Sequence, residues 1–239
     1  MADVHLFMGE KGGVGKSFVC ATAIDFHTER GLDCVPFDSD RTNPDIMKTY
    51  KEKAGARVAV FSESPRHADS ANAIINTAVD ENRRVLVNTS GNSLTPLLAW
   101  MNKSHFVDVM ADSGSTFFHW FVCSGGPDSL RMFGESVGRF DERVRHVFVK
   151  NFGITEDWEA FDKDKALQKL LKKHKAIVIE FPAFIGNIHR NEIKNLNLSF
   201  LEGREREEFG TVGRQRARSF LDAAADAFEQ AGVFDVAGE

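Results

Sequence analysis

The fold is decided by the stretch Lys11-Gly12-Gly13-Val14-Gly15-Lys16-Ser17. An apolar run typical of a buried strand, residues 4–8, precedes it, and an apolar segment typical of a helix begins at Phe18. Glycines between a strand and a helix let successive backbone N–H groups turn inward around an anion, and the helix N-terminus adds free N–H groups and a positive dipole end. Lys16 can reach the β- and γ-phosphates of a nucleotide, and the Ser17 hydroxyl suits Mg²⁺. A glycine-rich turn that binds no phosphate is the weaker interpretation, because Gly-Lys-Ser follows the glycines.

Apolar runs alternate with helical segments along the chain. Strands are expected at residues 4–8, 34–37, 58–61, 85–88, 116–123, 144–150 and 176–181, and helices at residues 17–30, 68–81, 94–110, 128–138 and 156–174. The strand segments are rich in Val, Ile and Phe without clean alternation, which is typical of strands covered on both faces. The repeated strand–helix order implies right-handed crossovers. We therefore expect an α/β fold with a doubly wound, mostly parallel sheet flanked by helices.

Length and composition fit one large domain. The chain has 239 residues and no evident linker, so we expect a single domain over residues 1–239 with a C-terminal helical part from about residue 187. No basic-plus-apolar leader and no apolar run of about eighteen residues is visible, which indicates a cytoplasmic protein. The chain ends in an acidic segment, residues 234–239, rather than a basic amphipathic helix, so no membrane docking is expected.

Polar residues follow two of the expected strands. Asp38 and Asp40 follow the second strand, and Asn88 ends the strand at residues 85–88. Ligands of open α/β sheets bind at the carboxyl ends of the strands, where phosphoryl transfer needs a positioned water and a metal ion. A plain turn is the alternative for the segment from Asp38 to Pro44, since Asp, Ser, Asn and Pro all favour turns. Given the glycine loop upstream, a carboxylate beside the bound phosphates is the stronger interpretation, and it favours Asp40 over Asp38.

The glycine loop departs from the common P-loop in two places. Glu10 stands where that pattern has its first glycine, and a second lysine, Lys11, follows it. This arrangement resembles the deviant Walker A motif of the ParA/MinD family of ATPases. The resemblance implies ATP or ADP with Mg²⁺ as ligands, and a homodimer formed on ATP binding in which Lys11 contacts the nucleotide of the other subunit. It also requires the Glu10 side chain to point away from the phosphates or to be paired.

The same resemblance assigns roles to individual residues. It implies that Lys11, Lys16 and Asp40 are catalytic, with Asp40 positioning the attacking water. It also implies a metal site that comprises Ser17, Asp40 and, through a water molecule, Asn88. The nucleotide-binding residues are Gly12, Gly13, Val14, Gly15, Lys16, Ser17 and Phe18, with Asn151 and Pro182 flanking the base. The family has Asp where this chain has Asn88, and an amide accepts a hydrogen bond but carries no charge. We therefore expect slow turnover or a pseudo-ATPase, and expect Asn88→Asp to raise the rate.

The resemblance also bounds the function. Within the family, the chain is similar to small plasmid-encoded members of the StbB and TraL type, which act in plasmid segregation, stability or conjugative transfer with an adaptor or DNA-binding partner. A metabolic P-loop ligase or an iron–sulfur reductase is the alternative. The reductase needs two well-placed cysteines, but only Cys123 falls at a strand end. A net charge of −5 excludes a generally basic surface; Arg190, Arg214 and Arg218 allow at most weak, salt-sensitive DNA binding, and a solvated helix face is the simpler interpretation.

Overall fold

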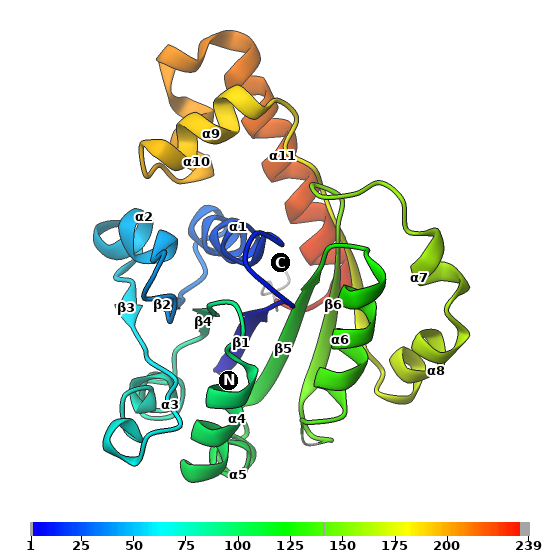
Figure 1. Cartoon of the computed structure of the whole chain (residues 1–239). Helices are drawn as coiled ribbons and strands as arrows, with labels where there is room; N and C mark the ends of the chain where they lie inside the picture. The colour runs from blue at the N-terminus through cyan, green and yellow to red at the C-terminus, as the bar shows by residue number, and fades with distance from the viewer. Residues whose placement is uncertain (1, 141, 235–239) are drawn as a thin grey trace.

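The computed structural model describes residues 2–140 and 142–234, and within them seven strands form one sheet (Figure 1). The strands are β1 (Asp3–Met8), β2 (Val35–Asp38), β3 (Arg57–Val58), β4 (Val85–Asn88), β5 (Thr116–Cys123), β6 (Arg145–Asn151) and β7 (Ile177–Phe181). Their order across the sheet is β3-β2-β4-β1-β5-β6-β7, and all neighbouring pairs are parallel. The predicted α/β fold with a parallel sheet is confirmed.

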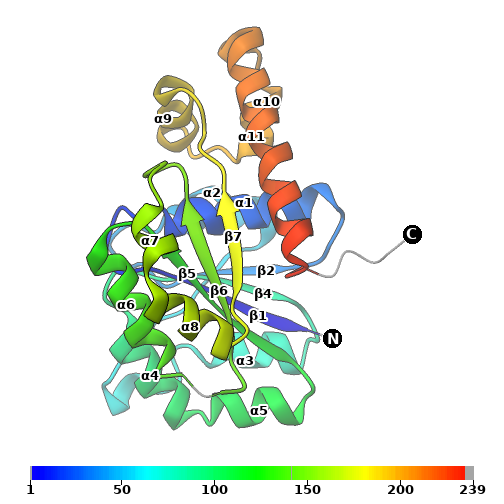
Figure 2. The ribbon, with the colours of Figure 1, turned by 90° about the vertical axis from the view of Figure 1, so that its right-hand side faces the viewer.

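Helices connect the strands and cover both faces of the sheet (Figure 2). They are α1 (Lys16–Glu29), α2 (Asp45–Ala54), α3 (Asn72–Val79), α4 (Leu94–Lys103), α5 (Phe106–Asp112), α6 (Pro127–Val137), α7 (Glu159–Lys163), α8 (Lys165–Lys173), α9 (Asn187–Asn195), α10 (Phe200–Glu205) and α11 (Gly210–Ala231), with 3₁₀ turns at Pro65–His67 and Glu207–Phe209. Helices α1, α2 and α11 lie on one face, and α3 to α6 and α8 lie on the other.

The strand residues divide between two cores because successive side chains point to opposite faces. In β1, Val4, Leu6 and Met8 pack on the face covered by α3, α4 and α5, whereas Phe7 packs on the face covered by α1 and α11. Every strand residue from Val4 to Met8 is buried. This two-sided burial explains why the sequence showed continuous apolar runs instead of alternation.

Three expected elements differ in extent. Strand pairing at residues 58–61 is limited to Arg57 and Val58. The helix expected at 94–110 divides into α4 and α5 at His105, whose φ of 51° lies in the left-handed region. The helix expected at 156–174 divides at Asp164, whose carboxylate accepts the backbone N–H groups of Ala166 and Leu167 and so begins α8.

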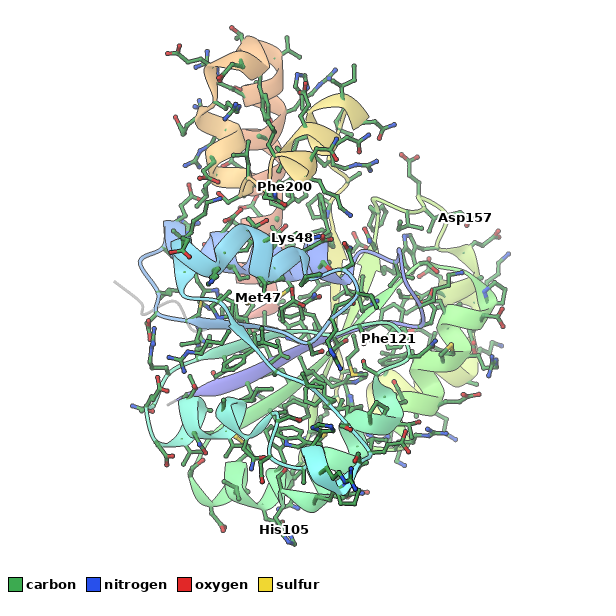
Figure 3. The ribbon with its side chains drawn as sticks, turned by 60° about the vertical axis from the view of Figure 1, so that its left-hand side comes forward. Met47, Lys48, His105, Phe121, Asp157 and Phe200 are labelled. Carbon is green, nitrogen blue, oxygen red and sulfur yellow. The ribbon has the colours of Figure 1, made fainter. Side chains whose placement is uncertain are left out.

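Helices α9, α10 and α11 form an arm, residues 187–231, that projects beyond the carboxyl ends of the strands (Figures 1 and 2). Its inner part is apolar, because Phe220 and Phe228 of α11 pack against Phe181 of β7. Figure 3 shows Phe200 at the foot of the arm, above α2, where Met47 and Lys48 are labelled. That the arm and the sheet form a single domain stays a prediction.

No helix among the described residues is long and apolar enough to cross a membrane. The acidic end of the chain, on which the sequence argument against membrane docking rested, lies outside the described residues from position 235 onward.

Candidate functional site: a phosphate-binding loop at the carboxyl edge of the sheet

The glycine loop leaves the central strand β1 through two residues that fix its path. A Cβ atom on Gly9 would lie 2.6 Å from Val14 Cγ2 and 2.8 Å from the Val122 carbonyl oxygen, so only glycine fits here. Glu10 is buried and accepts hydrogen bonds from the hydroxyls of Ser124 (2.6 Å) and Ser129 (2.7 Å). The carboxylate is therefore paired on the β5 side of the loop, which resolves how an acid can precede a phosphate-binding loop.

The loop backbone is shaped to receive an anion. Gly13 and Gly15 have φ values of 86° and 99°, a region in which non-glycine residues are strained. A Cβ atom on Gly12 or Gly13 would meet nothing within 4 Å, so open space lies above this part of the loop. Helix α1 begins at Lys16 directly after Gly15, and its first N–H groups face the loop as the sequence predicts.

The two lysines of the motif lie in different environments. Lys16 is buried, and its ammonium group donates a 2.8 Å hydrogen bond to the Lys11 carbonyl oxygen. Burial lowers the pKa of Lys16, while the carboxylates of Asp40 and Glu10 act in the opposite direction. Lys11 itself is exposed. Lys16 is thus held at the floor of the site, and the Lys11 side chain is accessible from outside.

The two carboxylates after β2 have different surroundings. Asp40 Oδ1 accepts hydrogen bonds from the Thr42 backbone and hydroxyl and from the Asn43 backbone. Partial burial acts to raise the pKa of Asp40, but these hydrogen bonds and the charge of Lys16 outweigh it and hold the pKa below its usual value. Asp38 is buried, and desolvation raises the pKa of its carboxyl despite hydrogen bonds from Asn88 and the backbone. Asp40, the predicted water-positioning residue, is therefore a carboxylate at neutral pH and lines the site.

Asn88 occupies the position where the resemblance led us to expect an acid. It is fully buried, and its Nδ2 donates a 3.0 Å hydrogen bond to Asp38 Oδ1. Its Oδ1 has no hydrogen-bond partner within the described part of the chain. A buried oxygen without a donor is costly, so this atom fits a water molecule of a hydrated cation. The Ser17 hydroxyl and Asp40 line the cleft and are oxygen donors of the kind that Mg²⁺ prefers.

Asn151 and Pro182, the predicted base contacts, are placed differently from each other. Asn151 Nδ2 donates to the Val14 carbonyl oxygen (2.8 Å), and its Oδ1 accepts from the Gly153 backbone (3.0 Å). Its side chain therefore supports the glycine loop. Asn151 also lines a cleft beside this loop. Pro182 lines a separate hollow of about 290 Å³ beside α11. The base-contact role of each stays a prediction.

A cleft of about 1310 Å³ lies beside the glycine loop. Loops from the carboxyl ends of the strands, helix α2 and the arm contribute its lining, which includes Lys16, Ser17, Phe18, Asp40, Thr42, Asn43, Gly91, Asn92, Asn151, Gly153, Phe184, Arg190, Asn191 and Lys194. Phe18 also contacts Phe181 and Phe200 edge-on and Phe220 in a tilted arrangement, which ties α1 to the arm.

Several residues of this cleft were not predicted from the sequence. A Cβ atom on Gly91 would lie 3.1 Å from the Gly12 backbone nitrogen, so the loop after β4 lies against the phosphate-binding loop. The Thr-Ser-Gly-Asn run after a strand was a usable signal for such a turn. Arg190, which the sequence offered only as a possible DNA contact, and Lys194 line the cleft because packing of the arm brings them there.

The cysteines bear on the reductase alternative. Cys20 and Cys123 are buried, and Cys34 is partly buried. Burial raises the pKa of the Cys123 thiol to about 11, although hydrogen bonds from Ser129 and Gly125 oppose the shift. A cluster ligand must be a thiolate, so the environment of Cys123 disfavours that role.

The parallel sheet with this loop after its central strand defines a P-loop NTPase of the ParA/MinD type. Among solved structures, the chain resembles MinD from Pyrococcus horikoshii in complex with Mg-ADP, with a TM-score of 0.59 and 14% identity over 98% of both chains. It also resembles the cell division ATPase MinD from Pyrococcus furiosus, with a TM-score of 0.53 and 14% identity over 96% of this chain and 99% of that one. Such identities show the fold alone.

Curated proteins narrow the class to a family. The chain is 31% identical to Protein MobD of Acidithiobacillus ferrooxidans over 191 residues, which cover 75% of this chain and 77% of that protein. A Protein TraL of Escherichia coli is 21% identical over 241 residues, covering 94% of this chain and 99% of that protein. No family model matches the chain. The chain belongs to the same family as Protein MobD.

Proposed function

We propose that this protein binds Mg-ATP in the cleft, dimerises on binding, and hydrolyses the nucleotide slowly. The observation that carries the proposal is the buried Lys16, held beneath an open glycine loop and electrostatically coupled to Asp40 across the same cleft. An isolated buried ammonium group is costly, so an anion bound above it would relieve that cost. The free N–H groups at the start of α1 add to this preference for a phosphate group.

The residues at the cleft would have different roles in phosphoryl transfer. The loop N–H groups and Lys16 would hold the β- and γ-phosphates, and Asp40 would orient the attacking water. When bound, Mg²⁺ would neutralise charge that develops on the phosphate oxygens. The Ser17 hydroxyl and the Asn88 amide oxygen would hold its shell, and the neutral amide supports slow turnover. The exposed Lys11 would reach the nucleotide of a second subunit.

The biological role that we propose is the movement or maintenance of plasmid DNA in the cytoplasm together with a partner protein. Membership in the MobD family and the similarity to TraL support this role. Direct DNA binding would be weak, would require the dimer, and would fall steeply with salt, because it would depend on arginines such as Arg214 and Arg218 contacting phosphates.

Thermal unfolding with and without Mg-ADP tests the proposal. Wild-type protein should gain melting temperature with ligand concentration, because a ligand that binds only the folded state stabilises it by mass action. Lys16→Ala should lose this gain. Lys169→Ala, an exposed lysine on α8, is the matched control and should keep it. Equal gains for Lys16→Ala and the control would refute nucleotide binding by this loop.

The Lys11→Ala variant distinguishes nucleotide binding from dimerisation. It should keep the gain in melting temperature but abolish dimerisation, measured by sedimentation with a slowly hydrolysed ATP analogue. A wild-type protein that remains monomeric at saturating nucleotide would rule out the dimer and leave nucleotide binding standing.

A further inference from the structure

Asp38 and Asn88 form a pair at the carboxyl ends of two neighbouring strands. Each is the last residue of its strand, β2 and β4, and the two stand directly opposite in the parallel register. Asp38 is 2% exposed and Asn88 0%, and 3.0 Å separates Asn88 Nδ2 from Asp38 Oδ1. Fifty positions lie between them in the chain, so the pairing follows from the sheet topology.

The carboxylate of Asp38 is saturated by protein donors. Its Oδ1 accepts the Asp40 N–H (3.1 Å) and the Asn88 amide, and its Oδ2 accepts the N–H groups of Ile46 (3.0 Å) and Met47 (3.1 Å). An ionised carboxylate offers about four acceptor sites, and all four are used. Asp38 therefore anchors the Asp40 backbone and the first turn of α2, where a negative charge is favourable.

The orientation of the Asn88 amide follows from this saturation. Only its Nδ2 can face a carboxylate, so its Oδ1 must face the other way. That oxygen is buried and has no partner among the described residues. It is a neutral acceptor held in one orientation by a neighbouring negative charge.

We propose that Asp38 and Asn88 act as one unit, in which Asn88 is a positioning residue that offers Oδ1 to a water of the magnesium shell. Asp38 supplies the negative charge of this unit from the neighbouring strand. This inference rests on the proposed Mg-nucleotide binding. It reverses the expectation drawn from the sequence, because Asn88→Asp would place two carboxylates about 3 Å apart in a buried site, where like charges repel strongly.

Exchange of the two side chains tests the unit. Four proteins are compared: wild type, Asn88→Asp, Asp38→Asn, and the double variant with both changes, which restores one amide and one carboxylate. Without nucleotide, each single variant should lose several degrees of melting temperature, and the double variant should recover most of that loss. Asn76→Asp, an exposed asparagine on α3, controls for the added charge and should leave the melting temperature unchanged.

The second measurement is the magnesium dependence of fluorescent ADP binding at equilibrium. Asn88→Asp should weaken the Mg²⁺-dependent part about ten-fold or more, the usual cost of disturbing groups around a metal shell, and the double variant should regain it in part. An Asn88→Asp protein as stable as wild type, with equal or tighter Mg²⁺-dependent binding, overturns the inference. Wild-type binding of ADP that ignores Mg²⁺ also overturns it but leaves nucleotide binding intact, whereas no ADP binding at all overturns the proposed function itself.

Discussion

The interior of the sheet and the foot of the arm both bury titratable side chains, but of opposite kinds. In the sheet, His119 of β5 and His146 of β6 are buried with their Nδ1 atoms 3.0 Å apart. At the foot of the arm, Asp25 of α1 is buried and accepts the Phe200 N–H at 2.7 Å. Burial favours the neutral form of the side chain in both places. An imidazole is neutral at pH values above its pKa, whereas a carboxyl is neutral at pH values below its pKa. The two regions therefore lose stability at opposite ends of the pH scale.

The foot of the arm depends on Asp25. Burial raises the pKa of Asp25 to about 7, although the hydrogen bond from the Phe200 N–H and the nearby Tyr50 hydroxyl and Leu201 backbone oppose the shift. Ion pairs near the protein surface join the arm to helices α1 and α2: Lys53–Glu202, Lys194–Asp45 and Arg204–Glu29. The arm also contributes Arg190 and Lys194 to the lining of the cleft.

The histidine pair lies deep in the sheet. Burial, followed by the charge of His174, lowers the pKa of His146 to about 4, and burial, followed by His146, lowers the pKa of His119 well below its usual value. A hydrogen bond between two imidazole nitrogens requires that one of them be unprotonated, so the bond is lost when both rings are cations. Phe140 packs against His119, with 4.4 Å between ring centroids, and leaves the pair in an apolar setting.

The largest effect is expected from Asp25→Asn. The folded pKa is raised from 3.8 to about 7, so the stabilisation from the neutral carboxyl is complete below about pH 4 and is lost as the pH rises to about 7. This rise in the pKa corresponds to about 4 kcal/mol of unfolding free energy. The amide variant does not titrate, so its stability relative to wild type should rise by this amount between pH 4 and pH 8 in urea unfolding.

The control for this prediction is Asp112→Asn, an exposed acid on α5, whose difference from wild type should stay flat across the same range. A flat difference for Asp25→Asn as well would show that the carboxyl at the foot of the arm stays ionised.

A somewhat smaller effect of opposite sign is expected from His146→Leu. Neutral His146 contributes stability above about pH 6.5, and that contribution is lost as the pH falls to about 4. The wild-type free energy of unfolding should therefore drop by about 3 kcal/mol more than that of the variant between pH 7 and pH 4. Urea unfolding at both pH values measures it, with the exposed His67→Leu as control. Parallel pH profiles for His146→Leu and wild type would contradict the assignment.

The smallest effect is expected at the surface of the arm. Lys194 is 3.3 Å from Asp45 and largely exposed, and exposed ion pairs contribute about 0.2–1 kcal/mol. Lys194→Ala should lower the unfolding free energy by about 0.5 kcal/mol at low salt and by nothing measurable in about 1 M salt, where charges are screened within about 3 Å. A loss that persists at high salt would mean that the arm depends on this contact for packing rather than charge.

Local patterns were sufficient for the strands of the sheet and for a helical part from about residue 187, but they did not give α2 or the separate helices of the arm. Helix α2 is polar and follows Pro44, and no side chain next to it caps its first turn. The Asp38 carboxylate caps the helix by accepting the N–H groups of Ile46 and Met47, which lie eight and nine positions further along the chain. A sequence rule for helix starts considers only the few residues next to the first turn, so it cannot detect this cap. Helix α10 was missed despite a local signal, since Ser199 and Glu202 form a capping box.

The sequence alone determined the strand, the glycine loop and the helix that follows it, and with them the fold class. Those features depend on backbone freedom at glycines and on side-chain periodicity over a few residues. Only the tertiary structure decided what the polar residues of the site do. Glu10 meets Ser129, Asp38 meets Asn88, and Asn151 meets Val14 across separations of 119, 50 and 137 positions. Strand order and register create these hydrogen bonds, and because a buried polar atom is costly until its partner arrives, the distant partner sets the role of each residue.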